Sequence, residues 1–297
     1  MRLWVGFFLF WLVAGSVPVS VASAAPIVVT DDAGFRVELA QPARRIVSLA
    51  PHVTEMLFAA GAGQWIVGAV SFSDYPPQAE EIPRVGSYNA MDLEAIIAKQ
   101  PDLVVAWGSG NPARIIDKLK QLGVNVYITE PQRLALIPDD IERLGRLTGQ
   151  AETAAAAARQ FRQRLRQLEE NRPTGVPVRV FYQIWDRPLM TIGGQQMISE
   201  VLSLCGGRNI FADLNGLAPQ IDLESVLAAN PEAIIFATAQ DRVPQWRQSW
   251  LRWPQLEAVR RDNVFALNPD LLHRHGPRII EGAEALCQVL DEVRARR

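Results

Sequence analysis

Short apolar runs alternate with amphipathic stretches along the first half of the chain. The runs are rich in Val and Ile, and the stretches between them carry apolar residues at helical spacing. Continuous apolar strands between helices are typical of a parallel sheet covered on both faces. A β-hairpin is predicted ahead of them, with arms at 27–29 and 36–39 around an Asp-Asp-Ala-Gly turn. The predicted strands are 46–49, 66–70, 103–107 and 124–128, and the predicted helices are 53–60, 92–99 and 115–122.

Residues 150–170 follow a different pattern. Alanines crowd the first part, Arg and Gln then alternate with Phe161, Leu165 and Leu168, and no Gly or Pro follows until Pro173. This spacing predicts one helix of about 20 residues, hence about 30 Å long. Strand and helix then alternate again, with strands predicted at 178–183 and 233–237 and helices at 197–204 and 223–228.

Two short sequence repeats, called echoes below, relate the two halves of the chain. Asp92-Leu93-Glu94 returns as Asp222-Leu223-Glu224, 130 positions later. Thr54-Glu55-x-Leu57 with Gly61 returns as Ser199-Glu200-x-Leu202 with Gly206. Chance is the alternative, because Asp-Leu-Glu before an apolar helix is common, but two echoes in the same order favour a duplication.

The predicted fold class is α/β, with two Rossmann-like lobes that each contain a parallel sheet. We place the first lobe at 25–148, a single bridging helix at 149–172 and the second lobe at 173–297. Ligands of open α/β sheets bind beyond the carboxyl ends of the strands, so we expect the ligand in the cleft between the lobes. A helical bridge flexes less than a pair of extended linkers, which predicts small lobe motions.

The first 24 residues have the features of a signal peptide. Met1-Arg2 supplies the positive start, 3–13 is apolar, and Ala22-Ser23-Ala24 is an A-x-A cleavage pattern. The alternative is an uncleaved membrane anchor, but a span needs about 20 apolar residues. We therefore expect cleavage near Ala24 and a soluble mature protein in the periplasm.

The composition and charge of the chain limit the classes of partner that it is expected to bind. The chain has 297 residues, of which 48% are hydrophobic and 21% charged, with a net charge of −2. Mixed charges of this kind predict no nucleic-acid surface and no polybasic membrane patch. The two cysteines, Cys205 and Cys287, favour a disulfide in an oxidising compartment, with two buried thiols as the alternative.

Aromatic residues follow several of the predicted strands. Tyr75 lies after the second strand, Tyr88 in the next loop, Trp107 at the end of the third strand, and Trp185 after the first strand of the second lobe. Rigid rings on loops of both lobes can hold a large flat ligand. The alternative is that these rings only seal the packing between lobes.

The sequence contains three histidines. His52 follows a predicted strand, and His273 and His275 lie in a loop before the last predicted helix. Together with Asp270 the three histidines could form a zinc site, which would suggest a secreted metal-dependent enzyme. No G-x-S-x-G elbow, H-E-x-x-H motif or phosphate loop is present in the sequence. We therefore predict neither an enzyme nor a metal or cofactor of its own, with His52, His273 and Arg274 as polar ligand contacts.

Four segments carry a family resemblance: 48–79 with its SDYPPQA motif, 92–111 with its AWGSGN motif, 205–213 and 219–236. They resemble the periplasmic cobalamin-binding proteins, which belong to the helix-bridged class of ABC-importer receptors that also serves heme and iron–siderophore uptake. The resemblance implies that Tyr75 and Trp107 line a corrin site, with Tyr88 in place of the usual Trp.

The resemblance also implies a polar pair near the ligand, Asp270 and Arg274, and it matches the family's cysteine pair. Three positions of the second lobe depart from the family: Ile184 and Met190 replace phenylalanines, and Ala218 replaces a tryptophan. Trp185 can fill part of that space. The wall of the second lobe is therefore less aromatic than the family pattern, which leaves three alternatives open: a different corrinoid, a heme, or cobalamin bound in a shifted pose.

Glu94 and Glu224 occupy equivalent places in the two echoes. In this class such glutamates pair with arginines of a two-fold permease, and an interaction with the helix dipole is the alternative role. The expected function is capture of a corrinoid by a monomeric protein and its delivery to an inner-membrane ABC permease dimer. A ferric siderophore ranks lower, because it needs a basic pocket and only Arg187 and Arg274 offer one.

Overall fold

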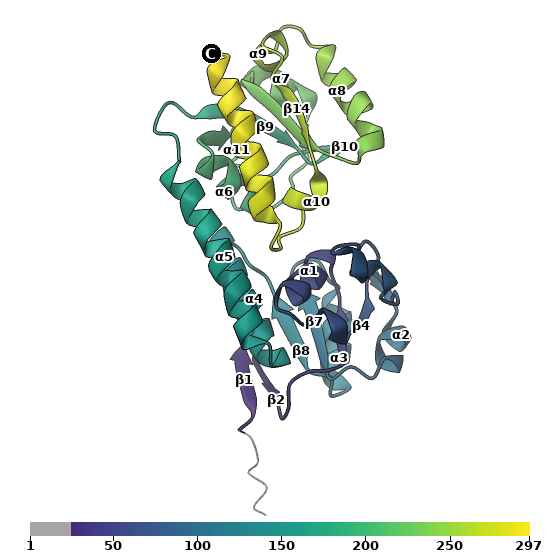
Figure 1. The fold of residues 1–297 in the computed structure, drawn as a ribbon. Coiled ribbons are helices and arrows are strands. Elements are labelled where there is room, and N and C mark those ends of the chain that lie inside the picture. The colour runs from purple at the N-terminus through teal and green to yellow at the C-terminus, as the bar shows by residue number, and fades with distance from the viewer. Residues whose placement is uncertain (1–24) are drawn as a thin grey trace, which may run out of the picture.

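The computed structural model describes residues 25–297 (Figure 1). The predicted signal peptide lies outside the described residues. Among residues 25–297, no helix combines the length and hydropathy that a membrane span requires. The chain forms two α/β units that lie one above the other, with a long helix alongside both.

The first unit contains a four-stranded parallel sheet in the order β4-β3-β7-β8. Its strands and helices confirm the predicted alternation, with ends that differ by one to two residues. The Val and Ile side chains on both faces of this sheet are buried. The elements are β3 (Ile46–Ser48), α1 (Pro51–Ala59), β4 (Ile66–Ala69), α2 (Leu93–Ala98), β7 (Leu103–Trp107), α3 (Ala113–Gln121) and β8 (Val126–Thr129), with short strands β5 (Gly86–Ser87) and β6 (Ala90–Met91) between β4 and α2.

The second unit repeats this topology. Its parallel sheet has the order β12-β9-β13-β14, so that β9 and β13 take the central places held by β3 and β7. The two echoes occupy equivalent elements, because α1 and α6 follow the first strand of each sheet, and α2 and α7 precede the next central strand. The elements are β9 (Val178–Gln183), β10 (Trp185–Asp186), β11 (Leu189–Met190), α6 (Met197–Leu204), β12 (Gly207–Asn209), α7 (Leu223–Ala229), β13 (Ala233–Ala237), α8 (Val243–Leu251), α9 (Glu257–Arg260), β14 (Val264–Leu267), α10 (Pro269–Leu272) and α11 (Ile279–Ala295).

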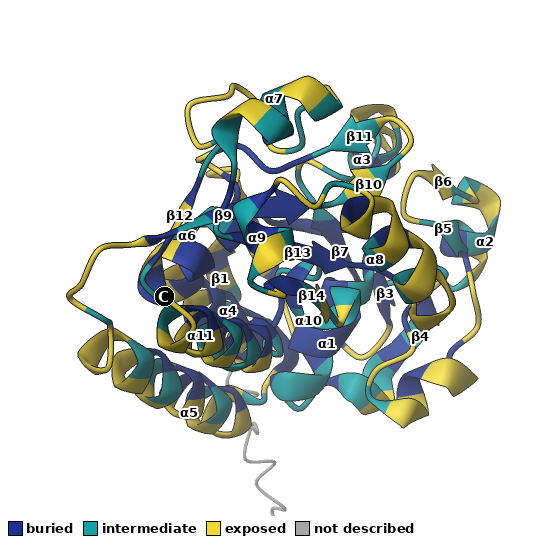
Figure 2. Cartoon of the chain, turned by 90° about the horizontal axis from the view of Figure 1, so that it is seen from above, coloured by how far each residue is buried: buried dark blue, intermediate teal, exposed yellow. Residues whose placement is uncertain are grey.

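The long helix is α5 (Ala151–Glu170), as predicted. It follows α4 (Ile137–Thr148), and the two helices approach so closely that a Cβ on Gly145 would lie 2.2 Å from the Cβ of Ala154. Arg164 of α5 then pairs with Glu284 of α11 at 2.7 Å, which ties the far half of the helix to the second unit. Seen from above, the outer positions of α5 are exposed, while the central strands β3, β7 and β13 are buried (Figure 2). The lobe boundaries given above stay a prediction.

The hairpin of β1 (Ile27–Thr30) and β2 (Arg36–Leu39) confirms the prediction and covers the open edge of β8. The Asp31 carboxylate accepts from the Ile128 N–H at 3.1 Å, and that of Asp32 accepts from the Glu130 N–H at 2.6 Å. Asp32 also pairs with Arg143 at 2.5 Å. These carboxylates satisfy backbone donors that an edge strand would otherwise leave unpaired.

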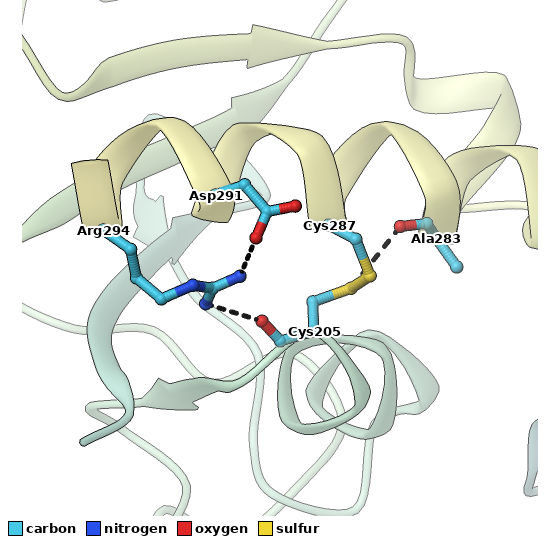
Figure 3. The surroundings of a disulfide bond; sticks show 5 residues. All are labelled: Cys205, Ala283, Cys287, Asp291 and Arg294. Atoms are coloured by element: carbon cyan, nitrogen blue, oxygen red, sulfur yellow. Dashed lines mark hydrogen bonds and ion pairs between the residues drawn. A yellow bond between two sulfur atoms is a disulfide. The ribbon is translucent and has the colours of Figure 1, made fainter. Parts of the chain in front are cut away.

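The predicted disulfide between Cys205 and Cys287 is confirmed (Figure 3). It joins the end of α6 to α11, with the two Cα atoms 4.6 Å apart. The Arg294 guanidinium donates to the Cys205 carbonyl oxygen at 2.9 Å and also binds the Asp291 carboxylate. The bond and this arginine together fix the last helix against the second sheet.

Candidate functional site

The loops at the carboxyl ends of the two sheets meet between the units. His52 lies in the first turn of α1, shortly after β3, and Gly276 follows β14 and α10. A Cβ on Gly276 would lie 3.2 Å from the Cβ of His52, so the chain segments of the two units touch there. This is the place where the α/β fold predicts a ligand.

A group of rings surrounds Trp107 at the end of β7. The His52 ring packs edge-on against it, with ring centroids 5.1 Å apart and planes at 90°. Tyr88 lies 6.0 Å from Trp107 at 41° and is 40% exposed. The structure therefore brings together three of the predicted site residues on one wall of the first unit.

All three histidines lie on or near this boundary, and burial keeps them neutral. Burial, followed by the charge of His275, lowers the pKa of His52 to about 3. Burial lowers the pKa of both His273 and His275 to about 4. His273 Nε2 lies 3.2 Å from the hydroxyl of Tyr182, which is fully buried, so Tyr182 orients the His273 ring from beneath. Among residues 25–297, no group of His, Cys, Asp and Glu side chains has the arrangement of a metal site.

Arg274 is bound by three carboxylates from both units. Its guanidinium lies 3.2 Å from Glu55, 2.6 Å from Asp74 and 2.9 Å from Asp270. Burial alone would raise the pKa of Asp74, but the hydrogen bond from Arg274 holds this pKa below its usual value. Asp270 and Arg274 thus pair with each other, and the arginine also joins the units. Sequence reasoning did not find this joining role, since Glu55 and Arg274 lie 219 positions apart. The contact of Asp270 and Arg274 with the ligand stays a prediction.

Glu55 is the centre of this ion cluster. Its carboxylate, with a side chain only 2% exposed, also accepts two hydrogen bonds from Arg278, at 2.9 and 2.6 Å. The Arg278 guanidinium in turn stacks over the Tyr75 ring, 3.8 Å from its centroid. Tyr75 also lines a cavity of about 320 Å³ beside α5. Its contact with the ligand stays a prediction.

The other two predicted or neighbouring rings lie on exposed loops. Trp185 on β10 is 44% exposed, and its Nε1 donates to the Arg187 carbonyl oxygen at 3.1 Å. Phe72, in the loop after β4, is 71% exposed and has a φ of 65°. A non-glycine residue in the left-handed region costs free energy, and such residues cluster at functional sites. Phe72 is thus a candidate ligand contact that sequence reasoning missed, because its only sequence signal was its place in an aromatic loop.

A cavity of about 750 Å³ opens between the units beside this wall. Ser109 and Glu130 line it from the first unit, and Gln195, Met197 and His275 line it from the second. It thus offers polar groups from both units within reach of one ligand.

Glu94 and Glu224 are both exposed and lie in the first turns of α2 and α7. Each helix begins with an aspartate cap, in which Asp92 accepts from the Ala95 N–H at 3.0 Å and Asp222 from the Ser225 N–H at 2.7 Å. Each cap satisfies one backbone N–H of its helix, and among residues 25–297 neither glutamate forms an ion pair.

Known proteins resemble this chain over most of its length. A vitamin B12-binding protein of Vibrio cholerae is 42% identical over 250 residues, which cover 84% of this chain and 90% of the relative. A vitamin B12-binding protein of Photorhabdus laumondii is 40% identical over 248 residues, which cover 84% of this chain and 88% of the relative. These relatives are binding proteins, so the resemblance to the cobalamin-binding proteins is confirmed.

Solved structures agree. The crystal structure of the periplasmic vitamin B12-binding protein BtuF of Vibrio cholerae superposes with a TM-score of 0.80 at 40% identity, covering 85% of this chain and 98% of that one. A periplasmic heme-binding protein from Roseiflexus matches with a TM-score of 0.76 at 23% identity, covering 84% and 98%, and shares the fold. The predicted α/β two-lobe fold is therefore confirmed. A family model described as periplasmic binding protein matches residues 46–271, and the chain belongs to that family.

Proposed function

We propose that this protein is a periplasmic receptor that binds a corrinoid of the cobalamin type between its two units and delivers it to an ABC importer, without catalysing a reaction. The observation that carries this proposal is the match to a periplasmic vitamin B12-binding protein over 98% of that chain, at 40% identity. The ring group around Trp107 supports it, because it lies where the fold places a ligand.

The site suits a large flat ligand with polar edges. Trp107, Tyr88 and Phe72 supply ring surfaces, and a fully covered aromatic ring buries about 150–250 Å². Neutral His273 and the polar lining of the 750 Å³ cavity can hydrogen-bond the amide side chains of a corrin. Nanomolar affinity corresponds to about 12 kcal/mol, which is attainable for a ligand of this size.

The second unit supplies fewer rings. Met190 pairs with Trp185 across the β10–β11 hairpin, while Ile184 and Ala218 are half-buried. We assign the ligand contact of this wall to Trp185, the exposed ring of the hairpin. The weaker stacking there favours a corrinoid whose contacts with the second unit are mainly polar, through His273 and Asp270.

Heme is the second candidate, and the three histidines favour it. All are neutral near pH 7, and the imidazole nitrogen is a common iron ligand. A ferric siderophore fits less well, because Arg274 is already neutralised by three carboxylates. The same geometry thus leaves two planar ligands to compare.

Delivery is assigned to Glu94 and Glu224. Both are exposed, and the shared topology of the two sheets gives them equivalent places in the two units. A monomer with two equivalent acidic points suits a two-fold permease that presents a basic residue to each. Charge complementarity of this kind sets the register and the rate of encounter.

Parallel absorbance titrations with cyanocobalamin, cobinamide and hemin decide between the ligands. The proposal expects one-to-one binding of a corrinoid below micromolar and only weak hemin binding. Tight hemin binding that shifts the Soret band and is lost in His273→Ala, with no corrinoid signal, would replace the corrinoid by heme.

A further inference from the structure

The side chain of Asn111 joins three loops of the first unit. It is 5% exposed and lies in the loop after β7. Its Oδ1 accepts from the Trp107 N–H at 2.7 Å, and its Nδ2 donates to the Leu49 carbonyl at 2.9 Å and to the Tyr88 carbonyl at 2.9 Å. Both N–H donors of the amide are used, which no other side chain of this size can reproduce.

The three bonds reach the segments that carry the ring group. Leu49 lies just before α1 and His52, Tyr88 lies in the turn between β5 and β6, and Trp107 ends β7. Leu49 and Trp107 already lie on neighbouring chain segments, because β3 pairs with β7 and the Leu49 N–H donates to the Val105 carbonyl at 2.9 Å. The Asn111 amide adds the bond that ties the Tyr88 turn to both. The amide therefore sets their spacing at the point where the rings emerge.

The rest of the loop fixes the ring of Trp107. A Cβ on Gly110 would lie 1.9 Å from the Trp107 Cε3 atom, so the ring rests directly on the Gly110 backbone. The Glu130 carboxylate accepts from the Ser109 N–H at 2.5 Å and from its hydroxyl at 3.1 Å. The loop is thus held by Glu130 at Ser109 and by the buried side chain of Asn111.

We propose that Asn111 is a positioning residue, which holds Trp107 and Tyr88 in the geometry that binds the ligand before the ligand arrives. The proposal deepens the proposed function and rests on it for the identity of the ligand. Its physical basis is preorganisation: rings that are already in place lose less freedom on binding, so affinity rises without any contact between Asn111 and the ligand.

The first test measures the cyanocobalamin Kd of Asn111→Ala and of Asn111→Asp, which keeps the size and the acceptor but loses both donors. Loss of a buried hydrogen-bonded amide is expected to weaken binding by about tenfold in each. Asn263→Ala is the matched control, because Asn263 is fully buried and donates to the Glu232 carbonyl at 3.0 Å, at the amino end of β14. Its Kd should stay within about twofold of the wild type, whereas an equal loss in the control would overturn the proposal.

A second test separates positioning from general stability. If Asn111 acts through Trp107 and Tyr88, adding Asn111→Ala to the double variant Trp107→Ala with Tyr88→Ala should weaken binding by less than about twofold further. A full tenfold loss in that background as well as in the wild type would show that Asn111 does not act through these rings, and would refute the proposal.

A ligand-free readout keeps the proposal apart from the proposed function. In protein labelled with 5-fluorotryptophan, the Trp107 fluorine resonance, assigned with Trp107→Phe, should broaden or split in Asn111→Ala and Asn111→Asp while the Trp65 resonance stays unchanged. An unaltered Trp107 resonance in both variants would overturn the proposal. Failure of the wild type to bind any corrinoid would instead contradict the proposed function, and this resonance would still test the role of Asn111.

Discussion

Replacing Glu55 with Gln should destabilise the protein more than any exposed ion-pair change. The Glu55 carboxylate is 2% exposed and pairs with Arg278 and Arg274, whose side chains are 13% and 11% exposed. Removing one partner of a buried pair costs about 3–5 kcal/mol, because the other charge stays buried. Arg274 keeps Asp74 and Asp270, so the lower end applies, and we expect a loss of about 3 kcal/mol in the free energy of unfolding.

Chemical denaturation followed by circular dichroism measures this loss, and a thermal scan should show a midpoint lower by about 5 °C. Glu200→Gln is the matched control, since Glu200 holds the equivalent place in the second echo. Its side chain is 31% exposed and lies 3.6 Å from Arg133, which is 72% exposed. We expect a change within about 1 kcal/mol there. Equal losses for the two variants would refute the claim that the buried cluster joins the units.

Three further predictions concern the disulfide, the titrating groups and the docking surface. Replacing both Cys205 and Cys287 with Ser should lower the free energy of unfolding by about 4–5 kcal/mol in the chain-entropy model, for a separation of 82 residues, and unchanged denaturation would contradict this. The three histidines have folded pKa values of about 3 to 4, below the unfolded 6.5, whereas burial raises the folded pKa of Asp140 to about 7 and partly offsets them. Unfolding then takes up about two protons near pH 5.5. The free energy of unfolding should therefore fall by about 2–3 kcal/mol per pH unit below pH 6.5. A thermal midpoint that stays constant from pH 7.5 to 5 would argue against neutral buried histidines. Glu94→Lys with Glu224→Lys should leave the corrinoid Kd unchanged but abolish uptake by the reconstituted permease, and normal uptake would remove the docking role.

Strong local patterns made most of the fold predictable. Local sequence patterns alone predict the Val- and Ile-rich strands of both sheets and the alanine-rich helix α5. Helix α4 was not predicted, although Pro138 at its start and apolar residues at helical spacing through Leu147 were a usable signal. Strand β12 has three residues and no apolar alternation, so only its pairing with β9 defines it.

The site was predictable where residues follow neighbouring strands and unpredictable where it depends on packing between the units. His52 and Trp107 come together because the parallel strands β3 and β7 end at one sheet edge. Tyr88 lies in the β5–β6 turn, which Asn111 ties to the same place. The ion cluster around Glu55 depends on how the two units meet, which no local pattern encodes. The exposed position and positive φ of Phe72 are likewise properties of the folded loop.

The most direct test of corrinoid binding between the units is an equilibrium titration of residues 25–297 with cyanocobalamin, in the wild type, Trp107→Ala and Trp65→Ala. Trp65 is the matched ring, since it precedes β4 at the opposite edge of the same sheet, where Arg44 stacks over it at 3.9 Å. We predict one-to-one binding below micromolar for the wild type and Trp65→Ala, and a loss of tenfold or more in Trp107→Ala, about 1.4 kcal/mol or above. Absence of corrinoid binding in the wild type, or equal affinity in all three proteins, would contradict the account.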